Sequence, residues 1–177
     1  PLSKNYLLNG DISINQRAFS SGSPLNSTGY FADRWKVDSN TACSVSPSSG
    51  GISILTTSAT NAVSISQPLE SIEATRLKGK TVTVSFTAFA VLESTSIVCS
   101  IQGSTTADSS SATFTTVSGG SKTITTTLSE VRHSLTAVIP VGTSTNGLRV
   151  NFAITNAANG TTIVIKNIQL EEGPVAT

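Results

Sequence analysis

The stretch YFADRWKVD, residues 30–38, contains the only tryptophan of the chain, Trp35, shortly after Tyr30 and Phe31. If this stretch is a β-strand, side chains alternate between its two faces, so Phe31, Asp33, Trp35 and Val37 share one face, with Asp33 at its rim. A face with Phe, Trp and Val is typical of the core of a β-sandwich. The alternative is that the tryptophan lies at the surface, where its ring would stack on the apolar face of a sugar.

The same alternation recurs along the chain in about ten segments, which indicates about ten strands. It is clearest in KTVTVSFTAFAV, residues 80–91, where Val82, Val84 and Phe86 alternate with threonine and serine. Charged residues make up only 12% of the chain, and β-branched and hydroxyl residues are abundant, which favours strands over helices. The sequence therefore predicts one all-β domain over residues 1–177, a two-sheet antiparallel jelly-roll β-sandwich. A strand at 11–19, DISINQRAF, would open it, with Ile12 and Ile14 on one face.

Turn-forming sequences separate the predicted strands, among them SGGS at 118–121. The Asn-Gly pair in NAANGTT, residues 156–162, suits a tight hairpin. Only QPLESIEATRLKGK, residues 67–80, has the spacing of a helix, and we expect one short helical turn near residues 69–78. Gly79 would end this turn, which would lie in a crossover between two strands.

Charge and hydropathy exclude two classes of partner. The net charge is +1 and the eleven basic residues are scattered, so we expect no binding of nucleic acid. No apolar run approaches the roughly 20 residues of a membrane-spanning helix, so we expect no membrane insertion.

The two cysteines, Cys43 and Cys99, lie in predicted strands, where they either pair across the sandwich or remain two buried thiols. With a single histidine they cannot complete a four-ligand zinc site without carboxylates, so no metal site and no cofactor is predicted. A structural Ca²⁺ near the chain ends is a less favoured alternative. Its ligands would be Asp11 and Glu171, if the first and last strands are neighbours.

The residues that catalysis needs are sparse. His133 is the only histidine, and no Gly-x-Ser-x-Gly sequence is present, so a triad is not predicted. Glycoside hydrolysis needs two converging carboxylates, and spacing alone does not show which acids converge. A depolymerase with carboxylates at a subunit interface remains an alternative, motivated only by the acids Glu70, Glu73, Glu171 and Glu172. The sequence predicts a protein that is not an enzyme.

Four motifs, taken in order, resemble a known family. They are NYLLNGDISINQR at 5–17, YFADRWKV at 30–37, ISQPLESIEATRLKGKTVTVSFTA at 65–88 and IKNIQLEEGPVAT at 165–177. Together they resemble the carbohydrate-binding-module-like domain of bacteriophage tail fibres and tail spikes. Residues 95–160 match that family only in their general strand character.

The resemblance implies a jelly-roll β-sandwich on a homotrimeric tail fibre or tail spike of the virion, assembled in the host cytoplasm. It implies a receptor-binding domain that recognises host cell-surface polysaccharide, and the chain would be a fragment of a longer fibre protein. The alternative is a structural domain that trimerises or stabilises the fibre and has no ligand of its own.

The candidate carbohydrate-binding residues come from the first stretch: Tyr30, Arg34, Trp35 and Lys36. If Trp35 is internal, recognition would depend on hydroxyl and amide side chains or on a groove between subunits of a trimer. Arg132 and His133 would contribute if their strand lies nearby.

Overall fold

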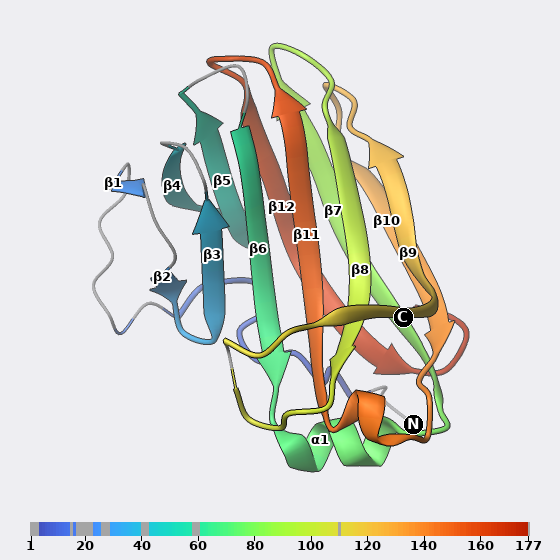
Figure 1. Ribbon diagram of the computed structural model, residues 1–177. Helices are drawn as coiled ribbons and strands as arrows, with labels where there is room; N and C mark the ends of the chain where they lie inside the picture. The colour runs from blue at the N-terminus through green and yellow to red at the C-terminus, as the bar shows by residue number, and fades with distance from the viewer. Residues whose placement is uncertain are drawn as a thin grey trace.

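The computed structural model describes residues 4–14, 16, 23–25, 29–39, 43–57, 61–109 and 111–176. In this part of the chain the strands form two facing six-stranded sheets, in which every pair of neighbouring strands is antiparallel (Figure 1). The predicted all-β sandwich is therefore confirmed. None of the helices in the described ranges is long and apolar enough to cross a membrane.

We name the two sheets A and B. Sheet A contains, in spatial order, β1 (Ser23–Leu25), β4 (Cys43–Ser48), β5 (Gly51–Thr56), β12 (Thr162–Glu172), β7 (Thr81–Val91) and β10 (Val131–Val138). Sheet B contains, in spatial order, β2 (Gly29–Ala32), β3 (Trp35–Ser39), β6 (Asn61–Leu69), β11 (Gly147–Ala157), β8 (Ser96–Ser104) and β9 (Thr115–Thr125). A 3₁₀ turn, Thr143–Thr145, precedes β11.

The predicted helical turn is the helix α1 (Ser71–Leu77), and it connects β6 of sheet B to β7 of sheet A. Ala74 and Leu77 are fully buried, as expected for one apolar side of a short helix, whereas Ile72 is 56% exposed. The chain leaves the helix at Gly79, which has a φ of +74°, a conformation that glycine adopts without strain. The sequence thus located both the helix and its end.

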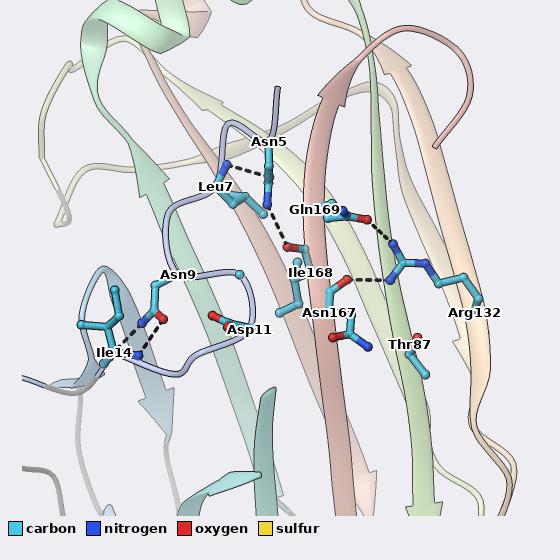
Figure 2. A pocket seen from close by; sticks show the side chains of 11 residues that line it. Asn5, Leu7, Asn9, Asp11, Ile14, Thr87, Arg132, Asn167, Ile168 and Gln169 are labelled. Atoms are coloured by element: carbon cyan, nitrogen blue, oxygen red, sulfur yellow. Dashed lines mark hydrogen bonds between the residues drawn. The ribbon is translucent and has the colours of Figure 1, made fainter. Parts of the chain in front are cut away.

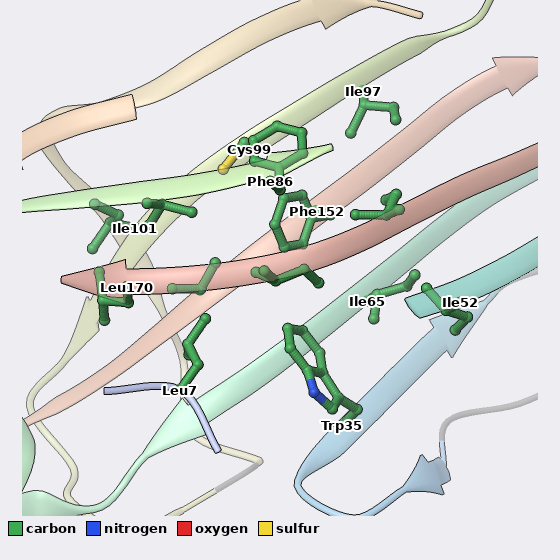
Figure 3. Close-up of a cluster of buried hydrophobic side chains, with 14 of the residues drawn as sticks. Leu7, Trp35, Ile52, Ile65, Phe86, Ile97, Cys99, Ile101, Phe152 and Leu170 are labelled. Carbon is green, nitrogen blue, oxygen red and sulfur yellow. The ribbon is translucent and has the colours of Figure 1, made fainter. Parts of the chain in front are cut away.

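The core lies between the two sheets (Figure 3). Phe86 from sheet A and Phe152 from sheet B meet edge to face, with ring centroids 4.8 Å apart. Trp35 is fully buried, and its indole Nε1–H donates a 2.8 Å hydrogen bond to the backbone oxygen of Asn9. The core interpretation of Trp35 is confirmed, and its assignment to a carbohydrate-binding surface is wrong because no part of the ring reaches solvent.

The stretch at 30–38 is not a single strand. It forms a tight hairpin, in which β2 ends at Ala32 and β3 begins at Trp35. The turn places Arg34 at a φ of +71° and shifts the register by one residue, so that Ala32 as well as Phe31 is buried. Asp33 lies in the turn and accepts a hydrogen bond from the backbone N–H of Gln16 at 2.8 Å, which agrees with the expected rim position.

The predicted strand at 11–19 is absent from its described residues, 11–14 and 16. The Asn9 side chain bonds both the N–H and the oxygen of Ile14, which closes a compact loop instead. Ile12, with a φ of +55°, points into the core, whereas Ile14 is 49% exposed. Local side-chain hydrogen bonds from an asparagine have replaced the pairing that a strand would need.

Two predicted turns have other roles. The glycines of SGGS, residues 118–121, lie inside β9, where an irregularity in its pairing with β8 takes up the extra residues. The Asn-Gly pair at 159–160 does turn the chain, with Gly160 at a φ of +81°. It joins β11 of sheet B to β12 of sheet A, so it is an arch between the sheets rather than a hairpin.

Cys43 and Cys99 form no disulfide, and both are fully buried. Burial in apolar surroundings raises the pKa of each thiol above its ordinary value. Because the thiolate is the reactive form, we expect neither cysteine to react with a thiol reagent such as Ellman's reagent in the folded protein. Both should react once the protein is unfolded in denaturant. Reaction of one thiol in native buffer would contradict the burial of that residue.

Candidate functional site

The residues predicted for binding lie on the outer face of sheet B, except for Trp35. Tyr30 on β2 is the register partner of Lys36 on β3, so their side chains emerge on the same face. Arg34 extends from the turn between these strands, and its Nη2 lies 2.6 Å from Oε1 of Glu70. The sequence thus identified one corner of a surface whose remaining residues come from distant strands.

Tyr30 and Arg34 line a hollow of about 450 Å³ at this corner. The end of β6, the start of α1 and the loop after β8 complete its wall. Within that loop, Asp108 accepts a 2.7 Å hydrogen bond from the backbone N–H of Ser71, the first residue of the helix, and this bond lowers the pKa of its carboxyl group. The remaining lining residues are Pro68, Leu69, Glu70, Ile72 and Ser109.

A row of short polar side chains crosses the middle of sheet B. Successive register partners on β3, β6, β11, β8 and β9 bring together Lys36, Ser66, Asn151, Ser100 and Ser121. Because adjacent strands lie about 4.8 Å apart, the row is about 19 Å long. We call these five residues the polar row.

The three central residues of the polar row, Ser66, Asn151 and Ser100, have unused hydrogen-bonding capacity. They are 1%, 6% and 3% exposed, yet within the described ranges their side chains have no hydrogen-bond partner. The polar atoms of these three side chains are not among the fully buried unpaired atoms of the described residues, which are Glu73 Oε2 and His133 Nε2, so they reach the solvent at the outer face. Hydroxyl and amide groups that remain unpaired on an outer face are suited to bonding a polar ligand.

An arginine borders the polar row on the side of the loop that leads into β9. Arg149, on β11, donates a 2.6 Å hydrogen bond from Nε to Oε1 of Gln102, and its guanidinium carbon lies 4.3 Å from the centre of the Phe114 ring. The segment with Phe114 passes across the front of the sheet in Figure 1. Phe114 and Tyr30 thus provide aromatic groups at two positions along one polar face.

A second hollow, of about 690 Å³, lies against sheet A, where the N-terminal segment meets β12, β7 and β10 (Figure 2). Its polar groups are largely engaged within the protein. Asn5 accepts hydrogen bonds from the N–H groups of Leu7 and Leu170. Arg132 donates to the backbone oxygen of Asn167 and to the side chains of Gln169 and Ser85. We interpret this region as the attachment of the N-terminal segment to the last strand.

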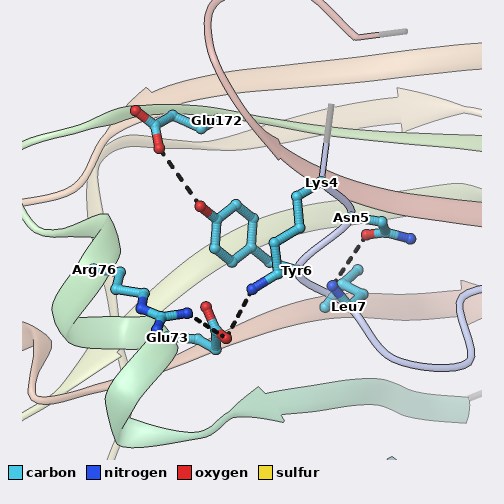
Figure 4. Close-up of polar contacts among 7 residues, drawn as sticks. All are labelled: Lys4, Asn5, Tyr6, Leu7, Glu73, Arg76 and Glu172. Atoms are coloured by element: carbon cyan, nitrogen blue, oxygen red, sulfur yellow. Dashed lines mark hydrogen bonds and ion pairs between the residues drawn. The ribbon is translucent and has the colours of Figure 1, made fainter. Parts of the chain in front are cut away.

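The acids that motivated a depolymerase alternative are engaged in contacts around the N-terminal segment (Figure 4). Glu73 forms ion pairs with Lys4 at 2.9 Å and with Arg76 at 3.3 Å. Oε1 of Glu172 lies 3.1 Å from Nζ of Lys80, and Glu70 forms an ion pair with Arg34. Glu171 is 1% exposed. Glu70 and Glu73 both line a small hollow of about 140 Å³, where each is held in an ion pair, while Oε2 of Glu73 is buried without a hydrogen-bond partner.

The Ca²⁺ alternative stays a prediction. Asp11 lines the hollow against sheet A, and its Oδ1 accepts hydrogen bonds from the backbone N–H and the hydroxyl of Ser13. Among the residues that the structure describes, no three His, Cys, Asp or Glu side chains come together as metal ligands.

His133 lies outside the polar row. On β10 it is the register partner of Phe86, and the two ring centroids are 5.6 Å apart. Its Nε2 is buried without a hydrogen-bond partner. Burial, and secondarily the nearby Lys122 ammonium, lower the pKa of His133 below its ordinary value of 6.5. His133 therefore belongs to the edge of the core, whereas Arg132 contacts the outer side of sheet A.

This position predicts a pH-dependent stability. The imidazole stays neutral in the folded protein at a pH where it becomes protonated in the unfolded chain, so the unfolded state binds more protons below about pH 6.5. Stability should be highest above that pH and should fall as the pH decreases towards the lowered pKa of the folded state. Urea midpoints at pH 7.5 and pH 5 should differ less in His133→Gln than in the wild type. The same difference in both proteins would assign the effect to other groups.

The sequence did not single out Ser66, Ser100, Asn151, Arg149 or Phe114. The signal was present, because the first four are polar members of alternating strands, which places them opposite the core face. It was not sufficient, because alternation does not show which strands are neighbours in a sheet.

No protein-family model matches the sequence, and no curated protein matches it. Solved structures do resemble the fold. The carbohydrate-binding module TmCBM61, in complex with β-1,4-galactotriose, aligns with a TM-score of 0.56 and 14% identity over 97% of this chain and 100% of that one. The CBM22-1 xylan-binding domain of Paenibacillus barcinonensis Xyn10C aligns with a TM-score of 0.52 and 13% identity, over 98% of this chain and 97% of that one.

A bacteriophage structure is also similar. The enzymatically active domain of tailspike protein 4 from bacteriophage CBA120 gives a TM-score of 0.54 and 11% identity, over 96% of this chain and 21% of that one. At these identities the similarity establishes the fold alone. The chain has the β-sandwich fold that these carbohydrate-binding modules share.

Proposed function

We propose that this chain is a non-catalytic domain that binds glycans on the outer face of sheet B. The observation that carries the proposal is the polar row, in which Ser66, Asn151 and Ser100 are nearly buried and have no partner among the described residues. A glycan presents many hydroxyl groups, each of which both donates and accepts hydrogen bonds. Such a ligand would satisfy these side chains, and Tyr30 at one end offers a ring for stacking.

We further propose that the domain belongs to a tail fibre or tail spike of a bacteriophage virion, assembles as a homotrimer in the host cytoplasm, and attaches to host surface polysaccharide. The order of the four sequence motifs supports this, and the shared fold with a tailspike domain is consistent with it. Three copies on one fibre would bind a repeating polysaccharide more tightly than one, because the second and third contacts are intramolecular.

Two measurements test this proposal. The solution mass, from light scattering during gel filtration, should be that of a trimer, and a monomer would contradict the fibre assignment. The domain should also bind host cells and members of a bacterial glycan array. A trimer that binds neither would instead support the purely structural alternative, in which the domain only stabilises the fibre.

A test for catalysis uses the same polysaccharides. Incubation of a bound polysaccharide with the domain should release no oligosaccharide. Release of fragments would show that the domain is an enzyme and would revive the carboxylates Glu70 and Glu73 as candidates.

A further inference from the structure

We propose that the glycan bound by sheet B is anionic, and that Arg149 binds its acidic group. This inference rests on the proposed function and specifies the class of ligand for the same face. Arg149 is the cation of that face that lies beside the polar row and is not neutralised within the protein. In the described part of the chain it has no carboxylate within ion-pairing distance, 4.0 Å.

The other cations on this face have ion-pair partners. Nη2 of Arg34 lies 2.6 Å from Oε1 of Glu70. Nζ of Lys36 lies 3.5 Å from Oδ1 of Asp38. Arg149 differs from both, because its one hydrogen bond to a described residue uses Nε and goes to the neutral amide of Gln102. The four N–H groups on its two terminal nitrogens remain available for a ligand.

The surroundings of Arg149 make this unpaired charge significant. The side chain is half-buried, and the Phe114 ring lies against the guanidinium at 4.3 Å. Burial lowers the pKa of Arg149, and the more distant Asp38 carboxylate partly offsets this effect. The group stays charged at neutral pH, so the protein holds a partly desolvated cation whose orientation is fixed by Gln102 and Phe114.

A planar guanidinium whose Nη1–Nη2 edge is free matches a carboxylate or sulfate group, which it binds through two parallel hydrogen bonds. Arg149 precedes Asn151 by two residues on β11, so both side chains emerge on the same face of the strand. One acidic sugar ring can therefore place its charged group on Arg149 and its hydroxyls on the polar row. The hollow beside Tyr30 contains Glu70 and Asp108, which favours an uncharged ring at that end.

The test compares each acidic polysaccharide with its own neutral form. The probes are polygalacturonate, alginate and hyaluronate, each alongside its carboxyl-reduced derivative, and dextran sulfate alongside dextran. Galactan and xylan extend the neutral panel. We expect at least one acidic probe to bind the wild-type domain tenfold or more tightly than its neutral form. The carboxylate and sulfate pairs show which acidic group is preferred.

Variants assign the effect to Arg149. Arg149→Gln should weaken binding of the acidic probe at least tenfold and leave the melting temperature within a few degrees of the wild type. Arg149→Lys keeps the charge without the two-pronged geometry and should show an intermediate loss. Arg76→Gln is the matched control, because it removes the same charge from helix α1, where Arg76 is 57% exposed and paired with Glu73. Its binding should equal that of the wild type.

Three outcomes would overturn the inference. Equal binding of acidic and neutral forms, or binding of neutral glycans only, would disprove the anionic ligand and leave glycan binding in place. Full binding by Arg149→Gln would disprove the role of Arg149. Absence of binding to every probe and to host cells would instead contradict the proposed function on which the inference rests.

Discussion

Trp35→Ala should lower the free energy of unfolding by about 3–5 kcal/mol, which is the usual loss when a buried aromatic side chain is replaced by alanine. The indole ring is fully buried between the sheets, and its Nε1–H bonds the backbone oxygen of Asn9 at 2.8 Å. The substitution therefore leaves a large cavity and also removes a contact that holds the N-terminal loop. Urea unfolding followed by circular dichroism measures the change, because the variant no longer contains a tryptophan.

Two further variants compare the buried ring of Trp35 with the partly buried ring of Tyr30. Trp35→Phe should lose less stability, because most of the cavity stays filled although the hydrogen bond to Asn9 is gone. Tyr30→Ala should lose about 1 kcal/mol or less, because Tyr30 is only partly buried, but it should weaken glycan binding. A Trp35→Ala protein with wild-type stability and no glycan binding would contradict the structure and restore Trp35 as a surface platform.

Asn151→Leu should weaken glycan binding at least tenfold without loss of stability. Each hydrogen bond between a ligand and this largely desolvated amide contributes about 1–3 kcal/mol, so its removal lowers affinity roughly tenfold to hundredfold. The apolar side chain also leaves any ligand hydroxyl above it unpaired. In the absence of ligand, the substitution removes a polar group that has no partner among the described residues, so the melting temperature should stay the same or rise. Calorimetric melting and titration with the best glycan from the array measure the two effects.

The control for Asn151→Leu lies on the opposite sheet. Thr87 lines the larger hollow against sheet A, and Thr87→Val removes one hydroxyl there. This variant should bind glycan as the wild type does. The reverse result, with binding lost in Thr87→Val and kept in Asn151→Leu, would place the glycan site on sheet A.

Features that depend on residues close together in the chain were predictable from the sequence, whereas the order of the strands was not. Alternation at 80–91 correctly placed Val82, Val84 and Phe86 in the core, since the side-chain direction of a strand follows directly from its pleat. The helix over Ser71–Leu77 was also foreseen, from its apolar spacing and from Gly79 at its end. The predicted strand at 11–19 failed in its described residues, because hydrogen bonds from the Asn9 side chain closed the loop instead.

The sequence by itself determined the fold class and the short helix, and it placed Tyr30, Arg34 and Lys36 close together, but it left Trp35 open between the core and the surface. These features depend on residues close together in the chain, where periodicity and turn chemistry apply directly. Only the tertiary structure decided which strands are neighbours, and therefore that Ser66, Asn151 and Ser100 form one row. The physical reason is that strand order and register result from packing two whole sheets on a common core, so residues as far apart as Ser66 and Asn151, 85 positions, become partners without any local signal.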